Sequence, residues 1–181
     1  MRLNSLFIII LFGIIFTMNG CTKHSSKFDV FVSNFIETTF ELEPTFAVNM
    51  GRHEFDGQLP DWSKEGITKH VEFLKDSRSK TMEFEDKNLS KAQRFDKKYL
   101  LAVIDEQLFS LEWARLPFTN PVYYEAIGPD VYLSREYASI EKRMKAYSVY
   151  ANNVPVAVEQ IIENMETPLP RTFAKVGKQI S

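Results

Sequence analysis

The chain has 181 residues, of which 44% are hydrophobic and 25% are charged, and its formal net charge is −2. This length suits one domain, and the composition is that of an ordinary globular protein rather than of a fibrous or disordered one. A net charge so close to zero gives no basis for a nucleic-acid partner, which would require a strongly basic surface.

The first 21 residues have the pattern of an export signal. The apolar run LFIIILFGIIF, residues 6–16, is too short to span a bilayer as a helix but has the length of a signal-peptide core. It is followed by MNGC, in which Gly20 precedes Cys21 as in a bacterial lipobox, whereas Asn19 departs from that pattern. We therefore predict that residues 1–21 form a signal peptide with a lipobox-like end and that Cys21 is lipidated. The alternatives are an uncleaved anchor or ordinary export with a spare thiol.

The rest of the chain, residues 22–181, is predicted to form one helical domain. Apolar residues spaced three and four apart predict a first helix over residues 26–42. Pro44 suits the first turn of a short second helix, and Gly51 is able to end it. The next helix is expected to begin with Ser63 as its N-cap.

The most apolar helix of the chain is predicted over residues 92–116. Ser90 and Gln93 have the spacing of a capping box at its start. Only one narrow edge of this helix looks solvated. That edge consists of Lys98, Asp105 and Glu112. A helix that is apolar on most sides is expected to lie at the centre of a bundle.

A connector with three prolines and one glycine covers residues 117–133, and another long helix is predicted to start near Ser134. Its apolar stripe consists of Tyr137, Ile140, Met144, Tyr147, Ala151, Val154, Val158 and Ile161. Pro155 lies within this stripe and is expected to kink or restart the helix. After a break at residues 166–170, residues 171–181 begin a further amphipathic segment. No long stretch alternates with period two, so we predict an all-α fold, an irregular multi-helix bundle.

The pair His53-Glu54 raises the question of a zinc peptidase. A zincin helix needs a second histidine four residues after the first, and its Glu activates water. Here Gly57 takes that position, and Asp56-Gly57 is a turn signal, so the pair is interpreted as part of an inter-helix turn. His70 is expected to be a half-buried helix residue and lies in no cluster with metal-ligand spacing. The sequence therefore predicts no metal-binding and no catalytic residue in this chain.

The connector contains NPVYYEAI, with Asn120, Tyr123 and Tyr124 close together. An aromatic ring with a polar tip suits a wet ligand groove, so these residues are candidates for a binding site. The alternative is a capped loop whose rings pack against the bundle. The sequence alone leaves both interpretations open.

Three stretches of the sequence form a set whose order and spacing are fairly specific. They are GRHEFDGQLPDWS at residues 51–63, NPVYYEAI at residues 120–127, and DVYLSREYASIEKRMKAY at residues 130–147, followed by Val154-Pro155. Together they resemble the N-terminal region of the bacterial domain-of-unknown-function 885 family. Asp56 and Gly57 lie in the turn motif of the first stretch, which marks them as a candidate groove or structural motif.

The resemblance implies an exported or lipid-anchored, largely helical protein that looks like a zincin-type metallopeptidase. The family's His-Glu motif lies downstream of the region matched here, so no metal position is carried over to this chain. Zinc would be expected only in a full-length member. The resemblance thus implies the N-terminal part of a larger helical zincin-like fold, truncated at its C-terminus.

Two functions remain open at this point. The first is the lipid-anchored N-terminal portion of a zinc-metallopeptidase-like protein, which lacks the catalytic motif. The second is a free-standing envelope lipoprotein that binds a peptide or partner. The expected partners are a bacterial membrane, reached through the lipid anchor on its periplasmic or outer side, and either a peptide or the missing C-terminal helical region. No nucleic-acid partner is expected.

Overall fold

The computed structural model describes residues 26–124, 128–169, 171–172 and 175, and these contain helices but no β-strand. The all-α prediction is therefore confirmed. The predicted signal, Cys21 and most of the amphipathic segment at residues 171–181 lie outside the described residues. No helix within the described part is both long and apolar enough to cross a membrane.

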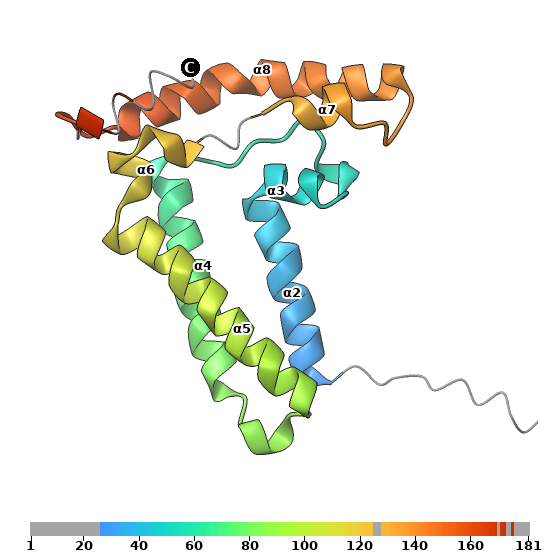
Figure 1. The fold of residues 1–181 in the computed structure, drawn as a ribbon, viewed down its shortest axis with the longest axis vertical. Coiled ribbons are helices and arrows are strands. Elements are labelled where there is room, and N and C mark those ends of the chain that lie inside the picture. Colours follow the sequence, from blue (N-terminus) through green and yellow to red (C-terminus); the bar gives the residue numbers. More distant parts are fainter. Residues whose placement is uncertain (1–25, 125–127, 170, 173–174, 176–181) are drawn as a thin grey trace, which may run out of the picture.

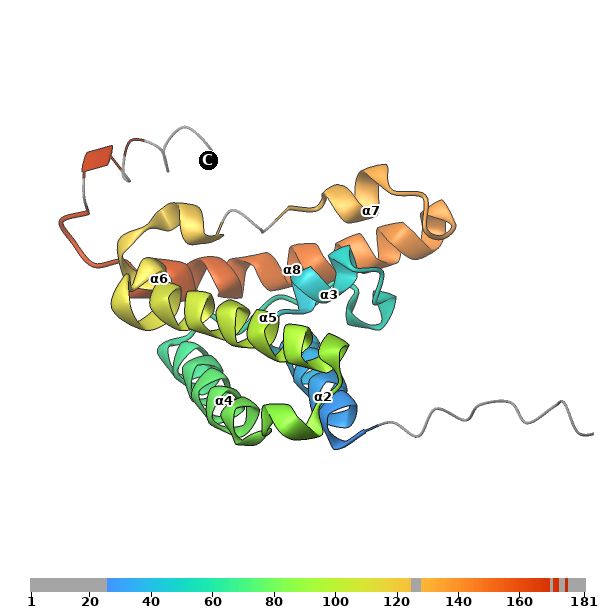
Figure 2. The ribbon, with the colours of Figure 1, turned by 60° about the horizontal axis from the view of Figure 1, so that its bottom comes forward.

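The α-helices of the described residues are α2 (Lys27–Leu42), α3 (Pro44–Asn49), α4 (Lys64–Glu83), α5 (Lys91–Leu108), α6 (Leu116–Thr119), α7 (Asp130–Ser134) and α8 (Ile140–Asn164). The same residues include the 3-10 helices η1 (His53–Phe55), η2 (Asp86–Asn88) and η4 (Pro121–Tyr124) and the π-helix η3 (Phe109–Trp113), which lie between them. Helices α2, α4 and α5 form one half of the molecule, while α8 crosses one end of this half with α7 along its side (Figure 1). Figure 2 shows the same three helices grouped below α8.

The starts of α2 and α5 are set by local sequence and are tied to each other. Ser26 with Asp29, and Ser90 with Gln93, form the two capping boxes, in which side chains satisfy backbone N–H groups that have no partner within the helix. Gln93 Nε2 also donates to Ser26 Oγ at 2.7 Å and to Asp29 Oδ1 at 2.8 Å. The N-terminal ends of two helices distant in sequence are thereby held together.

The main apolar core joins α2, α4, α5 and the π-helix. Its buried members are Phe35, Leu74, Leu100, Ile104 and Leu111. Leu74 and Ile104 are almost completely removed from solvent. Burying side chains of this size stabilises the fold by about 1.5–3 kcal/mol each, so this cluster sets the relative positions of the three long helices.

Helix α5 does not occupy the central position that its apolar composition predicts. It buries only Leu100 and Ile104. A second apolar stripe, made of large side chains on α5 and the π-helix, is exposed to solvent. It consists of Phe95, Tyr99, Phe109 and Trp113, which are 61–80% exposed. The predicted solvated edge is confirmed, since its three members are exposed.

The long C-terminal helix begins later than predicted. Ser134 is the last residue of α7, and α8 starts at Ile140 after Ser139, whose Oγ accepts from the Lys142 N–H. Pro155 lies inside α8 without restarting it, because the helix continues beyond this residue to its end at Asn164. Proline removes one backbone hydrogen bond, but packing on both sides keeps this helix continuous.

The buried face of α8 is rotated relative to the predicted stripe. Ala146, Tyr150 and Ala157 are buried, while Ile140 and Val158 of the predicted stripe are exposed. Tyr147, Val154 and Ile161 of that stripe are partly buried against the same core. Small alanines allow neighbouring segments to come close to the helix, which is why they take the positions that apolar size alone would assign to larger residues.

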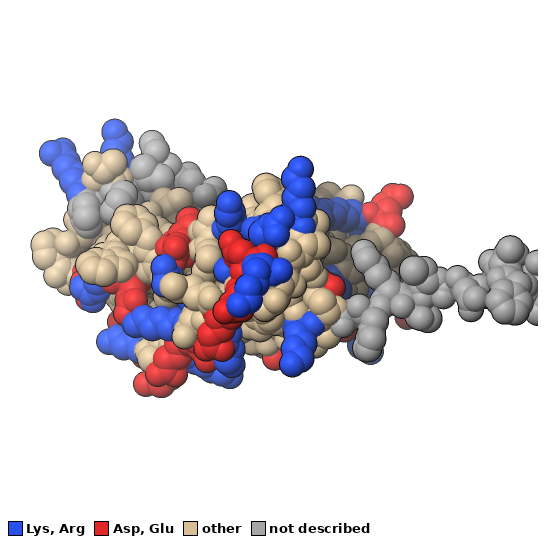
Figure 3. Space-filling model, turned by 90° about the horizontal axis from the view of Figure 1, so that it is seen from below, with Lys and Arg blue, Asp and Glu red and all other residues tan. Residues whose placement is uncertain are grey.

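The charged surface of the α4–α5 side carries both signs. Lys75 Nζ contacts Glu112 Oε1 at 2.5 Å, and Arg78 Nε contacts Asp105 Oδ1 at 2.6 Å. Figure 3 shows lysine and arginine interspersed with acidic residues on the face seen from below. Exposed pairs of this kind contribute little stability each, so they mainly keep this face soluble.

Candidate functional site

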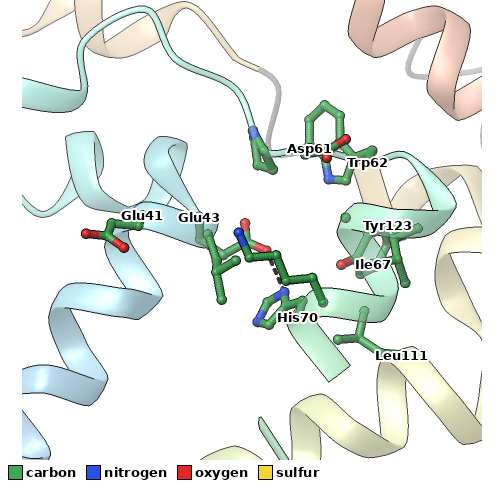
Figure 4. A pocket seen from close by; sticks show the side chains of 12 residues that line it. Glu41, Glu43, Asp61, Trp62, Ile67, His70, Leu111 and Tyr123 are labelled. Atoms are coloured by element: carbon green, nitrogen blue, oxygen red, sulfur yellow. Dashed lines mark ion pairs between the residues drawn. The ribbon is translucent and has the colours of Figure 1, made fainter. Parts of the chain in front are cut away.

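A cavity lies where the end of α2, the first two turns of α4, the π-helix and η4 meet. It has a volume of about 130 Å³, and an adjoining open hollow measures about 430 Å³. Both are lined by Glu43, His70, Leu111 and Tyr123, so these four residues form the wall between them. Figure 4 shows Glu43 and His70 pointing toward each other, with Tyr123 and Leu111 on the opposite side.

Local sequence places each polar group at this wall. Glu43 is the junction residue between α2 and α3, because Pro44 begins α3 and provides no N–H to continue α2. His70 follows Ile67 and precedes Leu74 at the spacing of one helix face, so it is carried toward the core with them. Tyr123 is positioned by the 3-10 turn of η4.

The central contact of the wall joins His70 and Glu43, with His70 Nδ1 lying 3.4 Å from Glu43 Oε1. His70 is only 9% exposed, and its Nε2 has no hydrogen-bond partner within the described part of the chain. Burial lowers the pKa of His70, and the nearby side chain of Gln107 partly offsets this by raising it. Even so, Gln107 makes no well-aligned hydrogen bond to Nε2, which remains unpaired. A buried nitrogen without a partner is rare in folded proteins and points to a group that a ligand can satisfy.

Burial controls the protonation of this wall. It raises the pKa of Glu43 to about 7, because the charged carboxylate loses water. It lowers the pKa of His70, which favours the neutral imidazole. Burial, and next the charge of Glu43, raise the pKa of Tyr123, so the phenol keeps its proton at neutral pH. Near pH 7 the wall thus holds a neutral His, a neutral Tyr and a carboxyl close to its midpoint.

The zinc that the resemblance implies for full-length proteins does not fit the residues described here. Within the described part, no three or more His, Cys, Asp or Glu side chains gather closely enough to hold a metal ion. Glu43 and His70 supply two potential ligands at most, whereas a catalytic zinc needs three from the protein.

The candidates of the tyrosine-rich connector have different roles. Tyr123 lines the cavity and also packs against the apolar core, so its position agrees with both the groove and the packing interpretation. Tyr124 is buried, and its hydroxyl donates to the Pro117 carbonyl at 2.8 Å and accepts from Asn164 Nδ2 at 3.2 Å. Asn120 Oδ1 accepts from the Val122 N–H and so shapes the turn. One tyrosine is therefore available to a ligand, while Tyr124 and Asn120 have structural contacts.

Asp56 and Gly57 lie away from the cavity, against α7 and α8. The Gly57 N–H donates to the Tyr132 hydroxyl at 2.8 Å, and its carbonyl accepts from Asn153 Nδ2 at 2.9 Å. Asp56 Oδ2 accepts from the Tyr137 hydroxyl at 2.9 Å. Of the two interpretations of this motif, groove or structural, the contacts are those of a structural turn.

His53 belongs to the same turn, which confirms that the His-Glu pair lies between helices. It is the first residue of η1, and its Nδ1 lies 3.1 Å from Asp56 Oδ1. Its ring stacks on Tyr137 with the ring centres 3.5 Å apart. One ring nitrogen of His53 and one face of its ring are thus in contact with neighbouring side chains.

Sequence reasoning missed Glu43 as a site residue and treated His70 only as a helix residue. The helical register predicted a half-buried His70, whereas the residue is buried, and no local pattern indicated its partner. Glu43 carries one usable signal, since an acid directly before Pro44 at a helix junction has its position fixed on both sides.

Comparison with known proteins identifies a family and a related fold. The model of the family described as "Bacterial protein of unknown function (DUF885)" matches residues 44–181. A solved structure described as "a putative lipoprotein of unknown function" from Shewanella oneidensis has a TM-score of 0.70 and 21% sequence identity. The alignment covers 78% of this chain and 26% of that one, so the chain spans about a quarter of the length of that structure. The sequence matches no curated protein.

Proposed function

The chain belongs to the DUF885 family of bacterial proteins, and from this premise we propose that it is the lipid-anchored, helical N-terminal part of a larger exported protein related to zinc metallopeptidases. The observation that carries the proposal is the fold, which aligns over most of this chain but over only 26% of a longer protein described as a lipoprotein. In this role the chain contributes a helical scaffold and a lipid anchor, and the metal-binding residues belong to other parts of the protein.

The exposed apolar stripe of α5 and the π-helix supports this proposal. Soluble monomers rarely leave several large aromatic side chains exposed together, because such patches favour association. Trp113 is 80% exposed and Phe95 is 68% exposed. A further helical region packed on α5 would cover them, and α5 would then take the central position that its composition predicts.

A second function, the free-standing binding lipoprotein, is favoured by one observation. The hollow beside Glu43 and His70 has a volume in the range of small-molecule sites, about 300–1,000 Å³, and combines apolar and polar groups. The hollow is formed without residues from any further domain, because all of its lining residues belong to the described part of this chain.

Lipidation at Cys21 is tested by comparing the full chain with a Cys21→Ser variant in a bacterium that processes lipoproteins. We expect the unchanged chain in the membrane fraction, with acyl chains on the mature N-terminus, because two or more acyl chains bind a bilayer stably. The variant is expected to lose the acyl mass. An unmodified Cys21, or cleavage at another position, found by mass spectrometry would contradict the proposed anchor.

The assignment of zinc to other parts of the protein is tested by elemental analysis. After dialysis the purified chain is expected to retain no stoichiometric zinc and to hydrolyse no peptide, because His53 is held by Asp56 and Tyr137 in a turn. A His53→Ala variant is the control and should have the same zinc content. One zinc per chain that disappears in this variant would show that the turn is a metal site after all.

A further inference from the structure

The larger hollow combines an acidic lining with an apolar one. Glu43 and Glu106 line it, and no lysine or arginine of the described part does. After burial, which is the largest cause, both carboxyl groups are close enough to raise the pKa of Tyr123, which also lines the hollow. Ser110 Oγ donates to Glu106 Oε1 at 3.0 Å and so orients the second carboxylate. The hollow therefore favours a positive charge over a negative one.

The remaining surface of the hollow is apolar. Phe46, Leu111, Leu116 and the ring of Tyr123 line it beside the carboxyl groups. An aromatic face attracts a cation and also packs against an apolar chain. Tyr123 is therefore suited to contact either a charged or an apolar part of a ligand. Burial of an apolar body would add affinity in proportion to its area.

His70 adds a hydrogen-bonding group to this lining. The Glu43 carboxylate contacts Nδ1, so the neutral tautomer that carries its proton on Nδ1 leaves the unpaired Nε2 as an acceptor. An alkylammonium group has three N–H donors, which match the acceptors that the wall offers: the carboxylate oxygens and the imidazole nitrogen. A hydroxyl group would supply only one hydrogen-bond donor. A carboxylate would supply none, and Glu43 and Glu106 would repel its negative charge.

We propose that this hollow binds a primary ammonium group attached to an apolar body, through Glu43, Glu106 and His70 and the apolar wall around Tyr123. The ammonium group has two possible sources, a free amine or the N-terminus of a short peptide. Binding requires the ionised carboxylate of Glu43, so affinity rises with pH until this group is fully charged. Besides His70, Tyr123 and Glu106, the charged groups beside Glu43 are Glu41, Asp61 and Lys69, which line the smaller cavity.

The proposal is tested by calorimetric titration of the full chain at pH 8 with hexylamine, hexan-1-ol and hexanoate. Only hexylamine is expected to bind. Glu43→Gln should weaken binding about tenfold or more, which is the effect of losing a charged hydrogen bond. Glu106→Gln, at an exposed position where folding is not at risk, should weaken it by a smaller factor. Glu41→Gln is the matched control, because Glu41 is outside the lining of the larger hollow and points away from His70 in Figure 4.

Leucyl-leucinamide and its N-acetyl form identify the source of the ammonium group. Binding of the free form without hexylamine binding assigns the site to peptide N-termini, whereas binding of hexylamine shows that a simple amine is sufficient. The proposal is overturned if neither amine binds, if hexan-1-ol binds as tightly as hexylamine, or if Glu43→Gln and Glu106→Gln both leave the affinity unchanged.

Discussion

Replacing Gly57 by alanine is expected to lower the free energy of unfolding by about 2–4 kcal/mol, the combined effect of backbone strain and overpacking. Gly57 has φ +82°, a conformation that L residues rarely adopt. A Cβ at this position would lie 2.7 Å from Val149 Cβ and 2.9 Å from the Ala146 carbonyl oxygen. The turn would have to move off α8, and its hydrogen bonds to Tyr132 and Asn153 would weaken.

Gly51→Ala provides the matched control. Gly51 has φ +89°, but an added Cβ would meet no atom within 4 Å. It is therefore expected to lose only the conformational part, about 1–2 kcal/mol. Urea unfolding of the full chain followed by circular dichroism measures both variants. Equal losses in the two variants would show that close packing of the turn on α8 is not important for stability.

Replacing Glu43 by glutamine is expected to stabilise the fold at pH 8 by about 2–3 kcal/mol, which corresponds to the raised pKa through linkage. Burial raises the pKa of Glu43 from 4.5 to about 7 in the folded chain. Between these values the folded state keeps a proton that the unfolded state has lost. The wild-type chain therefore loses stability as pH rises from about 4.5 to 7, and the glutamine variant does not.

The advantage of Glu43→Gln should accordingly disappear near pH 4.5. His70 contributes in the opposite direction, because its lowered pKa means that stability falls as pH drops below its unfolded value of about 6.5. Both chains keep His70, but its ring contacts Glu43, so their difference also includes any change in the titration of His70. Glu41 is exposed, and Glu41→Gln serves as the control for removing a nearby carboxylate from the surface. A constant difference between Glu43→Gln and wild type from pH 4.5 to 8 would contradict the raised pKa.

The sequence by itself determined the helical fold and several of the helix starts and turns. Ser63 and Ser90 act as N-caps and Pro44 begins a helix, as predicted, because capping involves residues within one turn of each other. The turn at His53 was also predicted, since the turn signals that follow it, and the missing second histidine, are local features. The family resemblance was found from three short stretches, residues 51–63, 120–127 and 130–147, and the match to the family model bears it out.

Only the tertiary structure decided which groups meet. Glu43 and His70 are far apart in sequence and come together because Phe35, Leu74 and Ile104 pack α2 against α4 and α5. The face of α8 that is buried depends on how closely Gly57 approaches, and an apolar spacing alone cannot show this. The sequence likewise predicted that α5 is apolar on most sides, but the side that remains exposed was decided by the packing of its neighbours. Such contacts depend on shape and distance across the fold, whereas sequence patterns report on neighbours along the chain.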